Sequence, residues 1–320
     1  MVIGQIFPIH RLGHEKGKGY KSFITRKTLA KRFMGDLKNR KISPEQYFVQ
    51  NVEAAKTLYD PRAQTVYTEF SAEEALINQH ISQILEYLNC RVPVFWGAGR
   101  KEAALVNASS NNIPLAIVID IEKAYVKDMI DRIDLSKRSR VKSLIALFQS
   151  FSEDEQKKYL QQMLDGKPAF HACLGTTIGN FNQHELFMIF RDTMQVGDYL
   201  LLGFQLEKDP EKILQEYRDD RLIEDIVKLP FLAALEDKGV GLHSWKYNYD
   251  EHQVEYWFTF TADYESKDSA LVFRSGDAIE VFRSKKYRVE QLRSELENHG
   301  LQYVMHVAKE DHCLLLLERV

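Results

Sequence analysis

The sequence predicts an α/β fold, and three observations support this prediction. Short apolar runs that are typical of buried parallel strands occur at 92–96, 115–119 and 199–203. Segments with helical periodicity separate these runs. Glycine-containing turns follow two strand-like segments, at 97–99 and at 175–179, where a parallel sheet passes into a helix and the backbone can approach a ligand. We therefore expect a ligand site beyond the carboxyl ends of parallel strands.

The composition suits a folded protein with a substantial core. The chain has 320 residues, of which 44% are hydrophobic, which is enough for one large domain or two smaller ones. Its formal net charge of −3 gives no reason to expect nucleic acid or an anionic membrane as a partner. Cys90, Cys173 and Cys313 lack metal-ligand spacing and suit reduced thiols in the cytoplasm. Neither an export signal nor a membrane span is expected from the sequence.

The N-terminal part predicts helices. Residues 10–42 are rich in Lys and Arg, and we favour a solvated helical face there over a phosphate-binding surface. A helix is expected at 44–58, capped by Ser43. Another is expected at 72–88, where Ser71 and the Glu three residues later have the form of a capping box.

The first strand, turn and helix resemble the start of a nucleotide-binding sheet. Gly97 and Gly99 follow the apolar run, and a helix is expected by Ala103. The next strand ends at Asp120, a carboxylate suited to accept hydrogen bonds from both hydroxyls of a ribose. The alternative is that Asp120 caps the following helix.

The remaining elements continue the pattern and then change it. We expect a strand at 141–148, helices at 152–164 (opened by Ser152), 183–194 (capped by Asn182), 209–235 and 287–299, and antiparallel hairpins at 245–261 and 301–317. Residues 60–208 and 285–320 are expected to form a Rossmann-like domain. Residues 1–59 and 209–284 are expected to form a second, α+β domain that binds substrate.

A family resemblance rests on four segments: 174–181 (Leu-Gly-Thr-Thr-Ile-Gly-Asn-Phe), 197–203 (Gly-Asp-Tyr-Leu-Leu-Leu-Gly), Lys208-Asp209 and 217–220 (Tyr-Arg-Asp-Asp). They resemble the histidine-specific S-adenosylmethionine (SAM) methyltransferases of ergothioneine biosynthesis and their fungal amino-acid-methylating relatives. The resemblance extends from about Tyr59 to the C-terminus. It implies a class I methyltransferase sheet, SAM as the cofactor, and a small-molecule substrate.

The resemblance also implies a set of cofactor-binding residues, namely Gly97, Gly99, Asp120, Phe148 and Thr177. The family's first loop reads Glu-Leu-Gly-x-Gly with a Lys shortly after, but here Phe95-Trp96 precede Gly97 and Lys101 matches only loosely. The family's third strand ends in Asp-Phe, where this chain has Leu147-Phe148, and its Ser after the ribose-binding acid is Glu122 here.

In the family, an Asn and a Tyr hold the substrate's α-carboxylate and α-amine, and they map onto Asn180 and Tyr217. We expect these two residues to act in substrate binding and catalysis, because an amide and a phenol bond a zwitterion without adding a competing charge. The alternatives are that Asn180 is a turn residue in the left-handed conformation and that Tyr217 is an aromatic residue on a helix surface.

The substrate side chain is expected to be apolar or aromatic rather than histidine. The family's Glu that binds the histidine imidazole falls on Phe282, its nearby Met falls on Tyr256, and its Ser is retained as Ser284. An aromatic pocket without that carboxylate leaves imidazole nitrogens unpaired and favours apolar groups.

These observations predict SAM-dependent N-methylation of a small amino acid or amine by a monomer or weak homodimer. Methyl transfer from a sulfonium needs alignment and a neutral nucleophile, so we expect no metal and no covalent intermediate. The pairs His171/Cys173 and His312/Cys313 fit alternating strand residues better than a metal site. Two alternatives remain open: a non-catalytic binding protein with a degenerate cofactor loop, and an enzyme that uses another small ligand in the same cleft.

Overall fold

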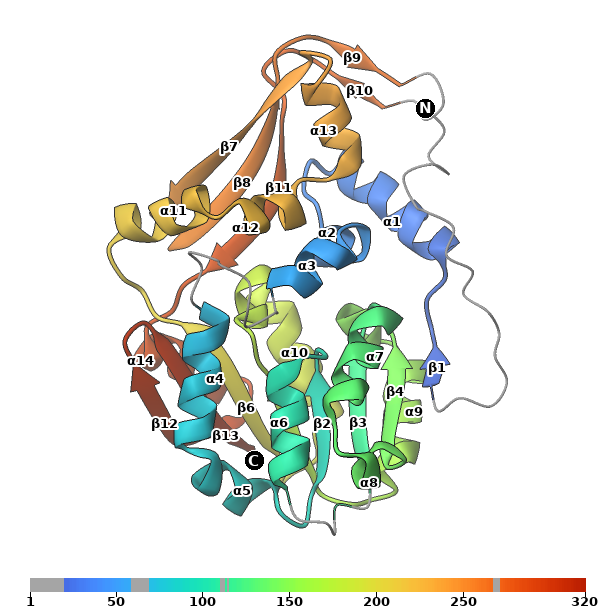
Figure 1. The fold of residues 1–320 in the computed structure, drawn as a ribbon, viewed down its shortest axis with the longest axis vertical. Helices are drawn as coiled ribbons and strands as arrows, with labels where there is room; N and C mark the ends of the chain where they lie inside the picture. Colours follow the sequence, from blue (N-terminus) through green and yellow to red (C-terminus); the bar gives the residue numbers. More distant parts are fainter. Residues whose placement is uncertain (1–19, 59–68, 110–112, 114, 267–270) are drawn as a thin grey trace. The chain divides into compact units, whose positions relative to one another are not determined.

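The chain folds into two compact units (Figure 1). A computed structural model describes residues 20–58, 69–109, 113, 115–266 and 271–320. Among these, unit 1 contains residues 24–58 and 209–285, and unit 2 contains residues 20–23, 69–208 and 286–320. Within the described ranges, no helix is both long enough and apolar enough to cross a membrane.

Unit 2 is built on an eight-stranded sheet with the order β1-β4-β3-β2-β5-β6-β13-β12. Its strands are Tyr20–Ser22 (β1), Val92–Trp96 (β2), Ala116–Asp120 (β3), Val141–Ile145 (β4), Ala169–Cys173 (β5), Tyr199–Gln205 (β6), Leu301–Lys309 (β12) and His312–Arg319 (β13). The strands from β1 to β6 run parallel, and β13 and β12 complete the sheet in antiparallel pairing. This mostly parallel sheet confirms the predicted Rossmann-like α/β fold.

The order of the strands reverses between β2 and β5. From β2 the chain proceeds outward to β3 and β4, and then returns to the other side of β2 to form β5 and β6. Val94 of β2 pairs with Ile117 of β3 on one side and with His171 of β5 on the other. In open α/β sheets such a switch point forms a crevice at the carboxyl ends of the strands, where ligands bind.

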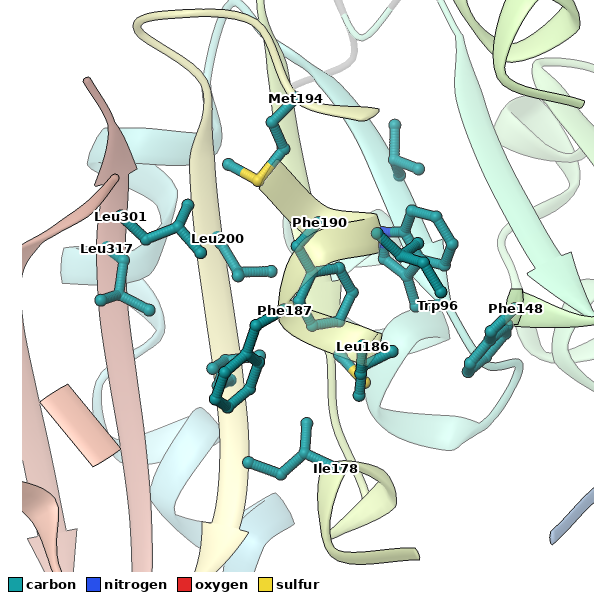
Figure 2. Close-up of a cluster of buried hydrophobic side chains, with 14 of the residues drawn as sticks. Trp96, Phe148, Ile178, Leu186, Phe187, Phe190, Met194, Leu200, Leu301 and Leu317 are labelled. Carbon is teal, nitrogen blue, oxygen red and sulfur yellow. The ribbon is translucent and has the colours of Figure 1, made fainter. Parts of the chain in front are cut away.

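Helices of unit 2 lie on both faces of this sheet, as Figure 1 shows. They are Glu69–Gln79 (α4), Ile81–Leu88 (α5), Arg100–Ala108 (α6), Lys123–Arg132 (α7), Leu135–Arg138 (α8), Asp154–Leu164 (α9), Gln183–Thr193 (α10) and Val289–Glu297 (α14), with 3₁₀ turns at Phe148–Ser152 (η2) and Thr177–Asn180 (η3). The apolar face of α10 packs into the core, where Phe190 contacts Trp96 of β2 with ring centroids 5.4 Å apart (Figure 2). Asn182 caps α10 as predicted, because its side chain accepts the Glu185 amide at 3.2 Å.

Unit 1 contains a three-stranded antiparallel sheet with the order β11-β8-β7 and a two-stranded ribbon of β9 and β10. Its strands are Gly241–Asn248 (β7), Gln253–Phe260 (β8), Tyr264–Glu265 (β9), Val272–Phe273 (β10) and Ala278–Lys285 (β11). Its helices are Arg26–Lys38 (α1), Pro44–Gln50 (α2), Val52–Leu58 (α3), Pro210–Asp219 (α11), Arg221–Val227 (α12) and Pro230–Glu236 (α13). The predicted hairpin at 245–261 is confirmed by β7 and β8.

Three segments predicted as helices are interrupted in the structure. The segment 44–58 forms α2 and α3, the segment 72–88 forms α4 and α5 with a break at His80, and the segment 209–235 forms α11, α12 and α13. At the first break, the Asn51 backbone leaves the helical region and its side-chain amide donates to the Ile226 carbonyl of α12 at 2.7 Å. A tertiary hydrogen bond therefore overrides the local helical pattern there.

Of three predicted serine caps, Ser71 and Ser152 are wrong, and Ser43 occupies the predicted N-cap position of α2 without a capping bond from its side chain. The Ser43 hydroxyl instead donates to the Asp36 carboxylate at 2.5 Å. Ser71 lies inside α4, which begins at Glu69. Ser152 ends the η2 turn, where its hydroxyl donates to the Gln149 carbonyl, and α9 begins two residues later. In each case another hydrogen bond or an earlier helix start removes the capping bond.

The basic segment at 10–42 is described only in part, since residues 10–19 lie outside the described residues. Its described helix, α1, buries Leu29, Phe33 and Leu37 and exposes much of the opposite face. This is the amphipathic helix that we favoured over a phosphate-binding surface.

Candidate active site

The turn after β2 forms an open cradle beside the switch point. Gly97 has φ +117°, a left-handed backbone conformation that favours glycine, and its amide donates to the Ile119 carbonyl of β3 at 2.8 Å. A Cβ atom placed on Gly97 meets no heavy atom within 4 Å. The backbone of Gly97 therefore faces open space, as close approach by a ligand requires.

Asp120 lies at the end of β3, next to this cradle. Its carboxylate accepts the Ala98 amide at 2.9 Å through Oδ2 and the Glu122 amide at 2.9 Å through Oδ1. The alternative interpretation of Asp120 as the helix cap holds only for its bond to the Glu122 amide, because the N-cap residue of α7 is Glu122, which accepts the Ala124 amide. Each Asp120 oxygen keeps a second acceptor position for a ribose hydroxyl. This geometry fits an adenosine-type cofactor.

Burial raises the pKa of Asp120 to about 7. The hydrogen bonds from the two backbone amides lower this pKa, but their effect is smaller than that of burial. Glu102 contributes a smaller upward effect from the first turn of α6. Burial also raises the pKa of Glu102 itself to about 7. Glu102 lies over the helix start, since a Cβ on Gly99 would come within 2.8 Å of its Oε2. A side chain at position 99 would therefore require the Glu102 carboxylate to move.

Phe148 lies beyond β4 rather than within it. The predicted strand at 141–148 ends at Ile145, and Phe148 begins the η2 turn. Its ring stacks on Phe181 with centroids 5.4 Å apart and meets Trp96 edge-on at 5.6 Å. This aromatic surface at the carboxyl end of β4 suits one face of a purine ring.

The loop after β5 presents Asn180 beside the switch point. Gly175 and Thr176 take positive φ angles of +76° and +59°, and the Thr177 hydroxyl donates to the Leu174 carbonyl at 2.6 Å. Asn180 does not have a positive φ, so the interpretation of it as a left-handed turn residue is wrong. Its side chain makes no hydrogen bond to any residue that the structure describes, and the residue is 8% exposed.

A buried ion pair that the sequence did not suggest joins α4 to this region. Glu73 of α4 is fully buried and pairs with Lys101 of α6, while its carboxylate accepts the Gly175 amide at 2.8 Å. Gly203 of β6 lies beneath it, and a Cβ there would come within 1.6 Å of Glu73 Oε1. The glycine in β6 is therefore required by a carboxylate that crosses over the strand.

In unit 1, four of the aromatic residues form a continuous cluster. Tyr217 of α11 contacts Trp245 of β7 and Phe282 of β11, with ring centroids 5.4 and 5.9 Å apart. Trp245 contacts Tyr256 of β8 at 4.5 Å and Phe282 at 5.9 Å. Tyr217 is 1% exposed, so the interpretation of it as a surface aromatic is wrong. Trp245 carries no sequence motif, and only the strand register brings it into the cluster.

The cluster includes a carboxylate from α12. The Tyr256 hydroxyl donates to Glu224 at 3.2 Å, and burial followed by the charge of Glu224 raises the Tyr256 pKa far above its usual range. Ser284 is buried on β11 opposite Val254. The family resemblance predicted an aromatic environment here, because Phe282 stands where the family has the Glu that binds the histidine imidazole. Glu224 supplies a different carboxylate that no pattern in the sequence indicated.

The candidate residues thus form two groups, one in each unit. Gly97, Gly99, Asp120, Phe148, Thr177 and Asn180 lie at the carboxyl ends of strands of unit 2, and Tyr217, Tyr256, Phe282 and Ser284 lie in unit 1. Within the part of the chain that the structure describes, no group of three or more His, Cys, Asp or Glu side chains is arranged to hold a metal ion.

Comparison with known families identifies the chain. The model of a family described as "Histidine-specific methyltransferase, SAM-dependent" matches residues 58–318. The chain belongs to this family. The family resemblance seen in the sequence motifs is therefore confirmed, and this family uses SAM as its cofactor.

A curated relative adds a more local likeness. Histidine N-alpha-methyltransferase of Mycolicibacterium smegmatis is 30% identical over 143 residues, which is 40% of this chain and 44% of that protein. The matched segment therefore spans less than half of the relative's length.

Two solved structures are among those similar to this chain. A SAM-dependent methyltransferase from Clostridium acetobutylicum is 10% identical, with 83% of this chain and 98% of that chain covered and a TM-score of 0.44. The N-methyltransferase NodS from Bradyrhizobium japonicum, in complex with S-adenosylhomocysteine, is also 10% identical, with 84% and 97% covered and a TM-score of 0.43.

Proposed function

We propose that this protein transfers a methyl group from SAM to the amino group of a small amino acid or amine. The observation that carries the proposal is the pairing of the open Gly97 cradle with Asp120 at the switch point of unit 2. Family membership supports the same chemistry. The donor would supply an electrophilic methyl group attached to a positively charged sulfur.

In this proposal, residues of unit 2 hold the cofactor. Asp120 accepts hydrogen bonds from the ribose hydroxyls, Gly97 and Gly99 let the backbone approach, Phe148 offers an aromatic face, and the loop at Thr177 borders the site. Charged hydrogen bonds of the Asp120 kind contribute about 1.5–3 kcal/mol each. The fit rests on the free acceptor positions of Asp120 and on the open space at Gly97.

Asn180 and Tyr217 are proposed to hold the head group of the substrate. The Asn180 amide is not used by any other described residue, which supports a role in binding rather than in the turn. Tyr217 is buried among aromatic rings, where a phenol makes a directional contact. Methyl transfer then depends mainly on alignment of the amine with the methyl group.

The side chain of the proposed substrate is apolar or aromatic rather than imidazole. Tyr256 and Phe282 lie within the aromatic cluster of unit 1, and the carboxylate of Glu224 accepts a hydrogen bond from the Tyr256 hydroxyl. An imidazole buried beside these rings would leave polar atoms unpaired at about 1–3 kcal/mol each. Ser284 is proposed as the remaining polar contact.

The test is titration calorimetry with SAM and S-adenosylhomocysteine, followed by methyl transfer from labelled SAM to histidine, tryptophan, tyrosine, phenylalanine and leucine. We expect wild type to bind both nucleotides and Asp120→Ala to bind them ~30-fold to 1000-fold more weakly, which corresponds to about 2–4 kcal/mol. Asp128→Ala, an exposed acid on α7, is the matched control and should bind as wild type does. If wild type binds neither nucleotide, the chain is a binding protein or uses another ligand, and the proposal is wrong.

A further inference from the structure

A buried polar cluster lies at the carboxyl end of β6, outside the residues discussed so far. His312, the first residue of β13, pairs with Gln205, the last residue of β6, so their side chains project from the same face of the sheet. Both residues are only 1% exposed. Asp311 and Lys208 form an ion pair next to them, and each of these side chains is 22% exposed, so the cluster reaches the surface.

Asp311 fixes the orientation of both buried side chains. Its Oδ1 lies 2.9 Å from Nδ1 of His312, and its Oδ2 lies 3.3 Å from Nε2 of Gln205. The hydrogen bond from His312 and the contact with Lys208 hold the pKa of Asp311 well below its usual range. Asp311 is therefore a carboxylate that only accepts, so Nδ1 of His312 and the amide nitrogen of Gln205 are the donors.

This orientation leaves two acceptor atoms without partners. In the neutral ring, Nε2 of His312 carries no proton, and the Oε1 atom of Gln205 also points away from Asp311. Neither atom has a hydrogen-bond partner among the residues that the structure describes, and both are shielded from solvent. Unpaired buried acceptors cost free energy that a ligand carrying N–H or O–H groups recovers.

The charge of the cluster favours a cationic donor. Asp311 sits directly behind the imidazole, and an Asp–His pair of this kind stabilises a positive charge at the outer nitrogen. A primary ammonium offers three N–H groups and matches two neighbouring acceptors. A water molecule satisfies the same two atoms but does not gain from the carboxylate.

We propose that His312 Nε2 and Gln205 Oε1 bind the N–H groups of a primary ammonium. The proposal stands on the contacts of this cluster alone and does not depend on the proposed function.

The proposal is tested in the wild-type protein by nitrogen NMR of labelled histidine. We expect methylammonium to produce a saturable shift of the His312 Nε2 signal, whereas tetramethylammonium, which carries the same charge but no N–H group, should not. The exposed His306 of the neighbouring strand is the internal control. No shift of His312 with methylammonium, or equal shifts with both ions, means that the site holds water only and overturns the proposal.

Discussion

At the scale of single residues, the ionisation of Asp120 makes cofactor affinity depend on pH. Burial places its pKa near 7, so the carboxyl group is largely protonated at pH 6 in the free protein. Ribose hydroxyls donate to the carboxylate more strongly than to the neutral acid, so binding favours ionisation. We therefore expect the affinity for SAM to rise about tenfold per pH unit below pH 7 and to level off above pH 8. Calorimetry between pH 5.5 and 8.5 measures this.

Replacing the carboxyl group of Asp120 measures its contribution to the pH dependence of SAM affinity. Asp120→Asn keeps the shape of the side chain but cannot ionise, so its SAM affinity should be low and nearly independent of pH. Glu102 also titrates near pH 7, and Glu102→Gln is the control for its share of the pH dependence. A pH profile that is the same in wild type and Asp120→Asn would show that Asp120 does not bind the cofactor.

A second residue, His243 of β7, makes unit 1 sensitive to acid. Its ring stacks on Tyr256 with centroids 5.0 Å apart, and burial lowers its pKa to about 4. The unfolded chain takes up a proton near pH 6.5, whereas the folded protein resists protonation until about pH 4. The free energy of unfolding therefore falls as the pH drops from 6.5 towards 4, by about 2 kcal/mol between pH 6.5 and 5.

His243→Phe keeps an aromatic ring and removes the titration. We expect the free energy of unfolding of this variant to fall much less than that of wild type on acidification, as denaturant titrations at pH 5, 6 and 7 measure. His306→Gln, an exposed histidine on β12, should retain the decline of wild type. If His243→Phe and wild type lose stability equally on acidification, another group is responsible.

At the scale of elements, the contact of α4 with the sheet depends on a buried charge. Glu73 pairs with Lys101 and accepts the Gly175 amide, with almost no exposure to water. Removing one partner of such a pair leaves the other charge buried, which costs about 3–5 kcal/mol. Glu73→Gln and Lys101→Met should each lower the free energy of unfolding by this amount, as denaturant titration measures.

The neighbouring residue of α4 is a matched control. Glu74 pairs with Arg100 at a site where the side chains are 25% and 19% exposed, so Glu74→Gln should cost less than about 1 kcal/mol. A similar loss in both Glu variants would contradict a special role for Glu73. Glu73→Ala combined with Gly203→Ala fills part of the space left by the carboxylate and should recover stability relative to Glu73→Ala alone.

Strands β8 and β11 determine the proposed side-chain preference, because their register places Tyr256 directly opposite Phe282. A buried imidazole without an acceptor should be disfavoured ~10-fold to 100-fold in kcat/KM against apolar or aromatic amino acids. Phe282→Glu combined with Tyr256→Met should shift this ratio towards histidine, as competition between labelled substrates measures. Wild type that methylates histidine faster than every apolar or aromatic amino acid tested would refute the preference.

The sequence predicted the elements whose pattern depends on local features. The buried strands β2, β3 and β6 are continuous apolar runs, and Asn182 caps α10 through a bond three residues away, so both could be read directly. The breaks at Asn51 and His80 could not. Asn51 bonds a carbonyl 175 positions away in the chain, and no periodicity within a helix indicates such a contact.

The same distinction holds for the candidate site. Gly97, Asp120 and Asn180 belong to motifs that end or follow strands, so the sequence indicated their positions at strand ends, while their roles stay a prediction. Glu73 and Glu224 belong to no motif, and each becomes a partner only when a helix packs against other elements. Glu73 is buried and Glu224 is partly exposed, so packing against other elements is what they share. Charged residues in amphipathic helices otherwise predict a solvated face.

At the scale of the whole molecule, the chain keeps the two halves of the proposed reaction in different units. The proposed cofactor residues belong to unit 2, whose sheet is interrupted in the sequence by residues 209–285 of unit 1 (Figure 1). The hairpin of β12 and β13 then returns to complete the sheet beside β6. Cofactor binding and side-chain recognition are therefore separable in this chain by mutation.

This division predicts where a nucleotide protects the backbone. S-adenosylhomocysteine at a hundredfold excess over its Kd stabilises the state that binds it by about 2.7 kcal/mol. If the nucleotide lies across Gly97 and Asp120, hydrogen exchange should slow most at 96–103, 119–124 and 174–181, and the slowing should be absent in Asp120→Ala. Exchange within β7 and β8 should change much less, because those strands hold none of the proposed cofactor residues. Protection that is concentrated in β7 and β8 instead would place the nucleotide in unit 1 and contradict the assignment of unit 2 as the cofactor domain.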